Sequence, residues 1–269
     1  MSNLQLMVEK SINKLLENTM SEKKLKILEK KHDQKVHFIP YRYRIIGGLL
    51  QSLNIQFGNF IENLIPYIAS IEINQNLEFL SESGKKNVKL SINHNTDRLI
   101  GEYITKRQIN LSFKTFDTEF KLLLQAIFNS EKLNNIKDNI ITHDLDMIFK
   151  DRRDGKIYYI ESKYTDDHDT GKFIDINSKF LKTYAGLINY LEIEKAEDIH
   201  PYIFYFNKIV KKANYFVCED THILRGPEFF DEFLTCKYQE LENVLSNISE
   251  SQEVLETFDK LYLKIRHNK

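Results

Sequence analysis

The sequence has almost no cysteine, which removes two classes of small-domain architecture. Cys218 and Cys236 are the only cysteines among the 269 residues, and they have neither a paired spacing nor histidines at zinc-finger intervals. This pattern argues against a disulfide scaffold and against a structural zinc site. It fits a reducing cytoplasm, where we expect the protein to stay.

The chain also lacks an excess of positive charge. Its 38 Lys and Arg and 39 Asp and Glu give a formal net charge of −1, so contacts with nucleic acid have to come from local clusters of Lys and Arg. We also expect no targeting segment in the first residues of the sequence. The first 21 residues carry Glu9, Lys10, Lys14 and Glu17 among their apolar residues, which is typical of neither a signal peptide nor a membrane span.

Helical periodicity dominates the first part of the chain. Apolar residues recur at helix spacing up to Pro40, with a polar break at Ser21. We interpret residues 1–40 as a helical N-terminal extension of a core formed by residues 41–269. Within that core, Ile45 to Ile71 keeps a three-to-four spacing that predicts one or two packed helices.

The next recognisable pattern is a hairpin. Leu145 to Phe149 and Ile157 to Ile160 are short apolar runs, and Asp154-Gly155 between them is a hairpin turn signal. Two antiparallel strands are therefore predicted. In residues 72–140, polar clusters separate short apolar groups and only Phe120 to Phe128 is clearly helical, so we interpret this region as an insertion on the core.

The remaining pattern predicts an α/β fold. An amphipathic stripe predicts a helix from near Lys172 to Leu191. Two further strands are expected at Tyr202 to Phe206 and Tyr215 to Val217, and helical segments at Phe229 to Leu234 and Val244 to Ile265. This order is typical of a mixed central β-sheet flanked by helices.

Two acidic residues and a lysine are expected to meet at the end of the hairpin. Side chains two apart in a strand share a face, so Glu161 and Lys163 project together, and the antiparallel partner brings Asp146 alongside. Asp146 and Glu161 would hold Mg²⁺ together with water and phosphate oxygens. Such an ion neutralises a phosphodiester and lowers the pKa of a bound water. Lys163 would orient or deprotonate that water, or stabilise charge on the phosphorus.

The E-x-K spacing alone is not specific. It also occurs three times in helical patterns, at Glu22/Lys24, Glu29/Lys31 and Glu119/Lys121. Only Glu161/Lys163 ends a β-type run that a turn joins to an aspartate-bearing run. The alternative interpretation is an ordinary hairpin with a solvated, salt-bridged end.

With these residues the chain resembles the PD-(D/E)xK nuclease superfamily, with Asp146 as the first acid and Glu161-Ser162-Lys163 as the E-x-K. Leu145 stands where the family usually has proline. Asp144 competes for the first acidic position, but Asp146 is followed directly by three apolar residues, as the family's aspartate is. The resemblance implies a restriction-endonuclease-like fold.

Two further stretches resemble type II restriction endonucleases in particular. In Asp166 to Tyr184 an acidic turn and a Lys-rich helix follow the E-x-K. Gln51 to Glu62 is similar to an early helix of such enzymes, in which a glutamate faces the metal site. By this resemblance Glu62 would act on the metal directly or through water, and a surface glutamate is the alternative.

The resemblance implies a type II site-specific deoxyribonuclease that hydrolyses double-stranded DNA at a short palindromic sequence with Mg²⁺, for which Mn²⁺ substitutes. A homodimer is expected because two-fold symmetric DNA is matched by two-fold symmetric protein. A cognate DNA methyltransferase would be its functional partner, and no membrane is involved. The alternatives are a repair or junction-resolving nuclease of the same superfamily and a non-catalytic nucleic-acid-binding protein.

Candidates for DNA contacts come from several parts of the sequence. Those beside the hairpin lie on the predicted helix after it: Lys172, Asn177, Lys179 and Lys182. The lysines would contact phosphates, with a solvated helix face as the alternative. Arg42 and Arg44 alternate with tyrosines and would reach phosphates or bases unless they simply pack. Arg225 precedes Gly226-Pro227, where a loop could enter a groove.

Four other polar residues have simpler interpretations than catalysis. Asp169 and Thr170 precede the predicted helix and are expected to cap its free N–H groups. His143 and His168 are expected to be hydrogen-bonded loop residues.

Overall fold

The computed structural model describes residues 3–33, 35–109, 115–133, 139–167, 169–211 and 213–267, and His168 lies outside these ranges. The chain forms two compact units. One combines Met1–Ile68 with Cys236–Lys269, and the other is Ala69–Thr235. This division differs from the boundary expected near residue 40. Within the described ranges, no helix is long and apolar enough to cross a membrane.

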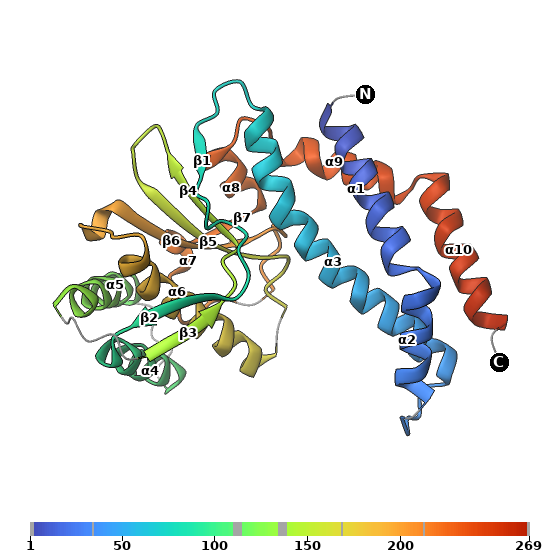
Figure 1. Cartoon of the computed structure of the whole chain (residues 1–269), viewed down its shortest axis with the longest axis horizontal. Helices are drawn as coiled ribbons and strands as arrows, with labels where there is room; N and C mark the ends of the chain where they lie inside the picture. Colours follow the sequence, from blue (N-terminus) through green and yellow to red (C-terminus); the bar gives the residue numbers. More distant parts are fainter. Residues whose placement is uncertain are drawn as a thin grey trace. The chain divides into compact units, whose positions relative to one another are not determined.

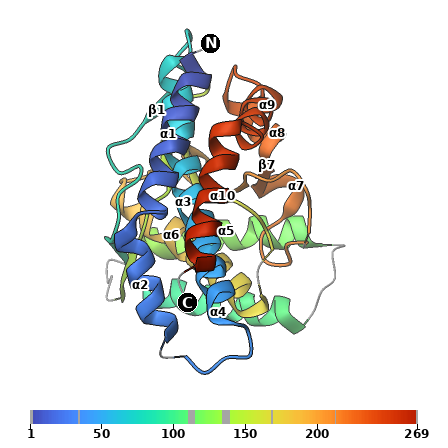
Figure 2. The same cartoon turned by 90° about the vertical axis from the view of Figure 1, so that its right-hand side faces the viewer.

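The first unit is helical and joins the two ends of the chain (Figures 1 and 2). Its helices are α1 (Asn3–Thr19), α2 (Glu22–Asp33), α3 (Tyr41–Ile71), α9 (Tyr238–Ser249) and α10 (Gln252–His267). Buried Leu25, Leu28, Leu49 and Ile265 pack α2, α3 and α10 together. The break between α1 and α2 and the long α3 confirm the predicted helices, whereas the predicted C-terminal segment is two helices.

The second unit is built on a five-stranded mixed sheet in the order β1-β4-β5-β6-β7. Its strands are β1 (Leu77–Phe79), β4 (Met147–Asp151), β5 (Ile157–Lys163), β6 (Ile199–Tyr205) and β7 (Ile223–Arg225). β1, β4 and β5 pair antiparallel, and β5, β6 and β7 pair parallel. The predicted mixed α/β architecture is therefore confirmed.

Helices cover this sheet on both faces, which explains why its strands are apolar on both sides. The helices of this unit are α4 (His94–Ile109), α5 (Phe116–Leu133), α6 (Thr170–Tyr190), the 3₁₀ turn η1 (Ala196–Asp198), α7 (Glu219–His222) and α8 (Gly226–Phe233). On one face Tyr159 of β5 stacks on Phe180 of α6, with ring centroids 5.6 Å apart. On the other face Phe149 and Tyr158 pack against Phe233 of α8.

A smaller sheet of β2 (Val88–Ile92) and β3 (Asn139–His143) also packs on α6. The approach is close enough to require a glycine, because a Cβ at Gly186 would lie 2.6 Å from the Cβ of Leu90. Residues 72–140 thus supply the edge strand β1 and the supporting elements β2, α4 and α5, beyond the single helix that was expected there.

The predicted hairpin is confirmed by the pairing of β4 with β5. The Asp151 N–H donates to the Lys156 carbonyl at 2.9 Å and closes the turn. Gly155 within it has φ +76°, a left-handed conformation that glycine adopts without a steric penalty.

The predicted strand at Tyr215 to Val217 is wrong. Side chains satisfy this buried segment in place of a strand partner. The Asn214 side chain accepts from two of its N–H groups, and Tyr103 and Arg107 donate to two of its carbonyls. An apolar run does not reveal whether its backbone is paired by a strand or by side chains.

Candidate active site

The register of β4 and β5 places Asp146 opposite Glu161. β4 and β5 pair Met147 with Ile160, so the next opposed pair outward is Asp146 and Glu161. Alternation along β5 puts Glu161 and Lys163 on the face covered by α6, the same face as Tyr159. The geometry expected from the sequence at this position is therefore present.

Asp146 is held by the backbone of the neighbouring strand. Its carboxylate is 5% exposed, and its Oδ2 accepts the Ser162 N–H at 2.9 Å. The same oxygen lies 3.5 Å from the Lys163 Nζ. These contacts fix one carboxylate oxygen beside the ammonium at the end of β5.

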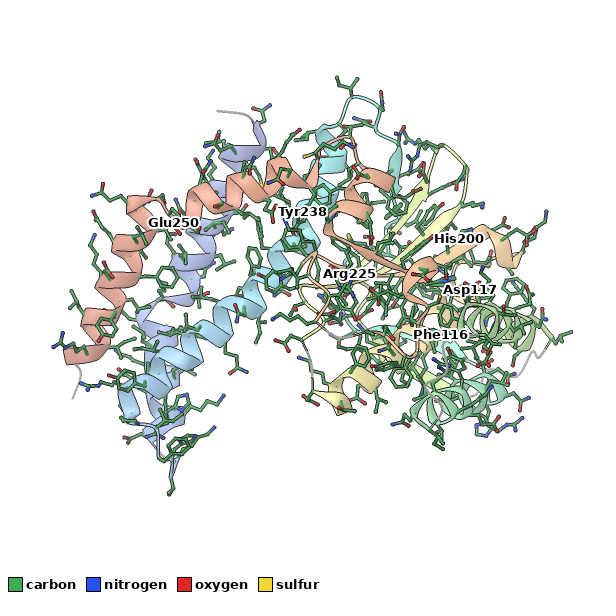
Figure 3. All side chains as sticks on the ribbon, turned by 180° about the vertical axis from the view of Figure 1, so that it is seen from behind. Phe116, Asp117, His200, Arg225, Tyr238 and Glu250 are labelled. Atoms are coloured by element: carbon green, nitrogen blue, oxygen red, sulfur yellow. The ribbon has the colours of Figure 1, made fainter. Side chains whose placement is uncertain are left out.

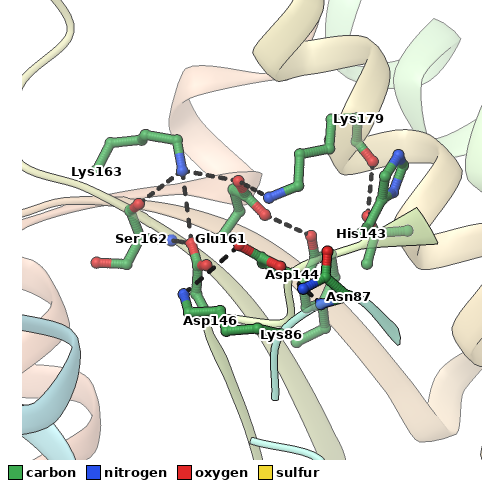
Figure 4. A network of polar contacts seen from close by, with 11 residues as sticks. Lys86, Asn87, His143, Asp144, Asp146, Glu161, Ser162, Lys163 and Lys179 are labelled. Atoms are coloured by element: carbon green, nitrogen blue, oxygen red, sulfur yellow. Dashed lines mark hydrogen bonds and ion pairs between the residues drawn. The ribbon is translucent and has the colours of Figure 1, made fainter. Parts of the chain in front are cut away.

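Glu161 is fully buried and lies within a network of polar contacts (Figure 4). Its Oε1 accepts from Lys163 Nζ at 2.7 Å and from Lys179 Nζ at 2.8 Å, and its Oε2 accepts from the Tyr159 hydroxyl at 2.8 Å. Burial by itself raises the pKa of Glu161, but the two ammonium groups outweigh it and hold that pKa at about 2.

The Lys163 ammonium is surrounded by three oxygens. They are Glu161 Oε1 at 2.7 Å, the Ser162 carbonyl at 2.8 Å and Asp146 Oδ2 at 3.5 Å. Within the described part of the chain, no group of three His, Cys, Asp or Glu residues is placed to hold a metal ion. The oxygens around the Lys163 ammonium belong to two carboxylates and one main-chain carbonyl.

Asp144 and His143 have other partners. Asp144 accepts the Asn87 N–H at 2.8 Å and is 45% exposed. His143 Nδ1 lies 2.8 Å from Thr183 Oγ1, and burial together with the nearby Lys179 ammonium lowers the pKa of His143. His143 is therefore hydrogen-bonded, as expected, although it lies in β3 and not in a loop.

Sequence reasoning missed two contacts that complete the site. Tyr159 donates directly to Glu161, and Lys179, which was expected to contact phosphate, pairs with the same carboxylate. The alternation rule that joined Glu161 to Lys163 also covers Tyr159, two residues earlier. The pairing of Lys179 had no local signal, because α6 brings it back over the sheet.

The other candidates on α6 have varied surroundings. Lys172 is exposed, and its N–H donates to Asp169, so the predicted N-cap is confirmed. Lys182 pairs with Asp97 at 2.6 Å. Asn177 is buried, donates to the Phe173 carbonyl and accepts from Asn214, so its contacts are internal to the fold.

Arg225 is also internal rather than in an open groove. It is 6% exposed (labelled in Figure 3), it pairs with Asp166 at 3.2 Å and with Glu219, and its guanidinium lies over the Tyr205 ring. This ion-pair cluster joins the loop after β5 to the end of β7. A DNA contact by Arg225 would require the cluster to open.

Three candidates belong to the helical unit. Arg42 is exposed and lies over the Tyr43 ring. Arg44 donates to the carbonyls of His32 and Lys35 at 2.9 and 2.8 Å. Glu62 is half-buried on α3.

Comparison with known proteins places the chain in a family. The model of the HinfI family of type II restriction endonucleases matches residues 1–249. The chain is 44% identical over 260 residues to the type II restriction enzyme HinfI of Haemophilus influenzae, which covers 96% of each chain. No solved structure matches it. On the strength of the near full-length match, the chain belongs to the HinfI family of type II restriction endonucleases and is a site-specific DNA endonuclease.

Proposed function

We propose that this endonuclease hydrolyses phosphodiester bonds of double-stranded DNA with Mg²⁺ held by Asp146 and Glu161, with Lys163 beside them. The observation that carries the proposal is the convergence of two buried carboxylates on one ammonium group at the end of the β4–β5 hairpin. In a solvated, salt-bridged hairpin end, which was the alternative interpretation, Glu161 would be exposed. Its complete burial favours a functional site.

The donor set fits a hard divalent cation. Mg²⁺ prefers oxygen ligands, and the oxygens gathered here are those of Asp146, Glu161 and the Ser162 carbonyl. The Lys163 ammonium already lies among these oxygens as a positive charge. When bound, Mg²⁺ would supply charge neutralisation of the phosphodiester and a bound water of lowered pKa.

The other groups of the site would prepare the reaction. The Tyr159 hydroxyl fixes Glu161 Oε2, and the Ser162 N–H fixes Asp146, so both carboxylates are oriented before a cation binds. Burial and the Glu161 charge raise the pKa of Tyr159, which therefore stays a hydrogen-bond donor. As an ammonium, Lys163 would orient the attacking water or stabilise charge that develops at the phosphorus, and it would deprotonate that water only after giving up its own proton. Glu62 is a further acidic group in the proposal, acting directly or through water.

Two variants test the assignment of the site. Glu161→Ala and Lys163→Ala should abolish Mg²⁺-dependent cleavage of plasmid DNA while circular dichroism and DNA binding remain close to those of the parent. The matched controls are Glu119→Ala and Lys121→Ala, since these residues form the same E-x-K triplet on α5, where Glu119 is half-buried and Lys121 is exposed. Retained nicking by both hairpin variants would overturn the assignment.

Membership of the family supports four finer properties of the enzyme as proposals. We propose a short palindromic target, a homodimer whose symmetry matches it, substitution of Mg²⁺ by Mn²⁺, and a cytoplasmic enzyme paired with a DNA methyltransferase. A digest of mapped DNA with sequenced fragment ends tests the palindrome, and sedimentation of the protein with its cognate DNA tests the dimer. Asymmetric recognition sites or a monomeric complex would contradict these properties.

A further inference from the structure

Helices α2 and α3 form a pocket whose ionisable lining is entirely basic. It has a volume of about 470 Å³ and lies within the helical unit. Among the described residues that line it, none is acidic. The cations and histidines of this basic pocket are Lys24, Lys31, Lys35, Arg44, His32 and His37. The whole chain has a net charge of −1, so the positive charge of this pocket comes from local clustering and not from the overall composition.

The ammonium groups of the lysines in the basic pocket have no ion-pair partner among the described residues. In the described part of the chain, no carboxylate lies within ion-pairing distance of Lys24, Lys31 or Lys35, and Lys31 and Lys35 are exposed. Arg44 has a structural task, because it binds the carbonyls of His32 and Lys35 just after α2. The pocket therefore combines an arginine that is hydrogen-bonded to the main chain with three ammonium groups that form no ion pair within the described ranges.

The charges around His32 also indicate a positive potential in the basic pocket. Burial lowers the pKa of His32, and the positive charges of Lys35, Arg44 and Lys31 lower it further. A histidine whose neighbours disfavour its charged form marks a region of positive potential. An anion entering the pocket would be attracted by that potential.

Gly47 is a further indication that the basic pocket binds a ligand. A glycine inside a helix costs about 1 kcal/mol relative to alanine, so its presence needs a reason. At Gly48 the reason is packing, since a Cβ would lie 3.0 Å from Leu28 Cδ2, whereas a Cβ at Gly47 would meet no atom within 4 Å. The missing side chain of Gly47 leaves the α3 backbone open where it lines the pocket.

We propose that the basic pocket binds the sugar–phosphate backbone of DNA. Several separate ammonium groups fit a chain of phosphates, and Gln51 and Ser52 in the lining are neutral donors of the kind that contact phosphate and sugar oxygens. The proposal deepens the proposed function, because it assumes that DNA is the substrate. It does not depend on the metal site.

The first test changes the charge at Gly47. Gly47→Glu adds a carboxylate to the lining of the pocket, its Cβ would meet no atom within 4 Å, and Glu is a better helix former than Gly. Gly101→Glu is the matched control, since Gly101 is an exposed glycine within α4 whose Cβ would also meet nothing. DNA affinity is measured by fluorescence anisotropy in EDTA. We expect Gly47→Glu to weaken binding about tenfold relative to Gly101→Glu, equally for cognate and random DNA.

The second test measures how many phosphate contacts are lost. Combining Lys31→Gln with Lys35→Gln should reduce the slope of log affinity against log salt by about 1.8, or 0.9 for each contact. The control combines Lys10→Gln with Lys14→Gln, which are exposed on α1. Slopes and affinities equal to those of the controls in both tests would overturn the proposal. Because EDTA prevents Mg²⁺-dependent cleavage, loss of cleavage in the hairpin variants and loss of binding here are separate outcomes.

Discussion

In the proposed metal site, Lys179 would compete with the divalent cation for the same oxygen of Glu161, so its removal should strengthen cation binding. Its Nζ lies 2.8 Å from Glu161 Oε1, while Lys163 occupies the other side of that oxygen at 2.7 Å. Lys179→Met keeps the length of the side chain and removes the charge. We therefore expect the DNA-free protein to bind Mg²⁺ and Mn²⁺ more tightly after this substitution.

The magnitude follows from the distances. A divalent ion on that oxygen would stand within roughly 5 Å of the Lys179 ammonium, where an effective dielectric constant of about 20 gives a repulsion of about 7 kcal/mol. Lys179 is 28% exposed, so its flexible side chain can turn into solvent and avoid most of this repulsion. We expect about 1.4 kcal/mol to remain, which is about tenfold in affinity.

Titration calorimetry of the DNA-free protein with Mn²⁺ measures this change, and the thermal shift produced by the cation provides a second readout. Lys182→Met is the matched control, because Lys182 is on the same helix, is 29% exposed and pairs with Asp97 instead of Glu161. Without cation, Lys179→Met should also lower the free energy of unfolding by about 1 to 2 kcal/mol, since Glu161 keeps only one of its ammonium partners. Equal Mn²⁺ affinity in both variants would refute the competition.

Two further predictions concern ionisable side chains away from the site. Burial lowers the pKa of His222 from its ordinary value of 6.5 to about 4. Between these values the unfolded chain binds more protons, so stability should fall by up to about 3 kcal/mol as the pH drops from 6.5 to 4. Urea unfolding of His222→Leu should show a flatter pH dependence, and an unchanged one would contradict this reasoning. Arg225→Met should destabilise the fold by about 3 kcal/mol, because it leaves the buried Asp166 without its guanidinium partner. Weaker DNA binding with unchanged urea stability would instead assign Arg225 to the DNA surface.

The hairpin and its site could be predicted because every signal for them is local. The Asp-Gly turn fixes the register of β4 and β5, and alternation then fixes which side chains share a face. Asp146 and Ser162 are only 16 residues apart in sequence. Short-range rules were therefore sufficient to bring the two carboxylates and Lys163 together.

The rest of the unit depends on long-range pairing that no local pattern reveals. β1 and β2 find their partners far along the chain, in β4 and β3, so their region resembled an insertion. Asn177 and Arg225 looked like surface residues because their partners, Asn214 and Asp166, are 37 and 59 residues away. Polar residues are buried only when such partners satisfy them, and the sequence does not show which partners will meet.

The positive charges of Lys163 and Lys179 balance the negative charge of Glu161, and another cation could replace them. An ionised carboxylate in a fully buried position costs several kcal/mol unless it is paired, and Lys163 and Lys179 provide that pairing in the metal-free protein. With a divalent cation at Glu161, as proposed, Lys163 and Lys179 would lose this pairing and would need another anion. A DNA phosphate is such an anion. Because each ligand neutralises the charge that the other leaves exposed, cation and DNA should strengthen each other's binding by the same factor.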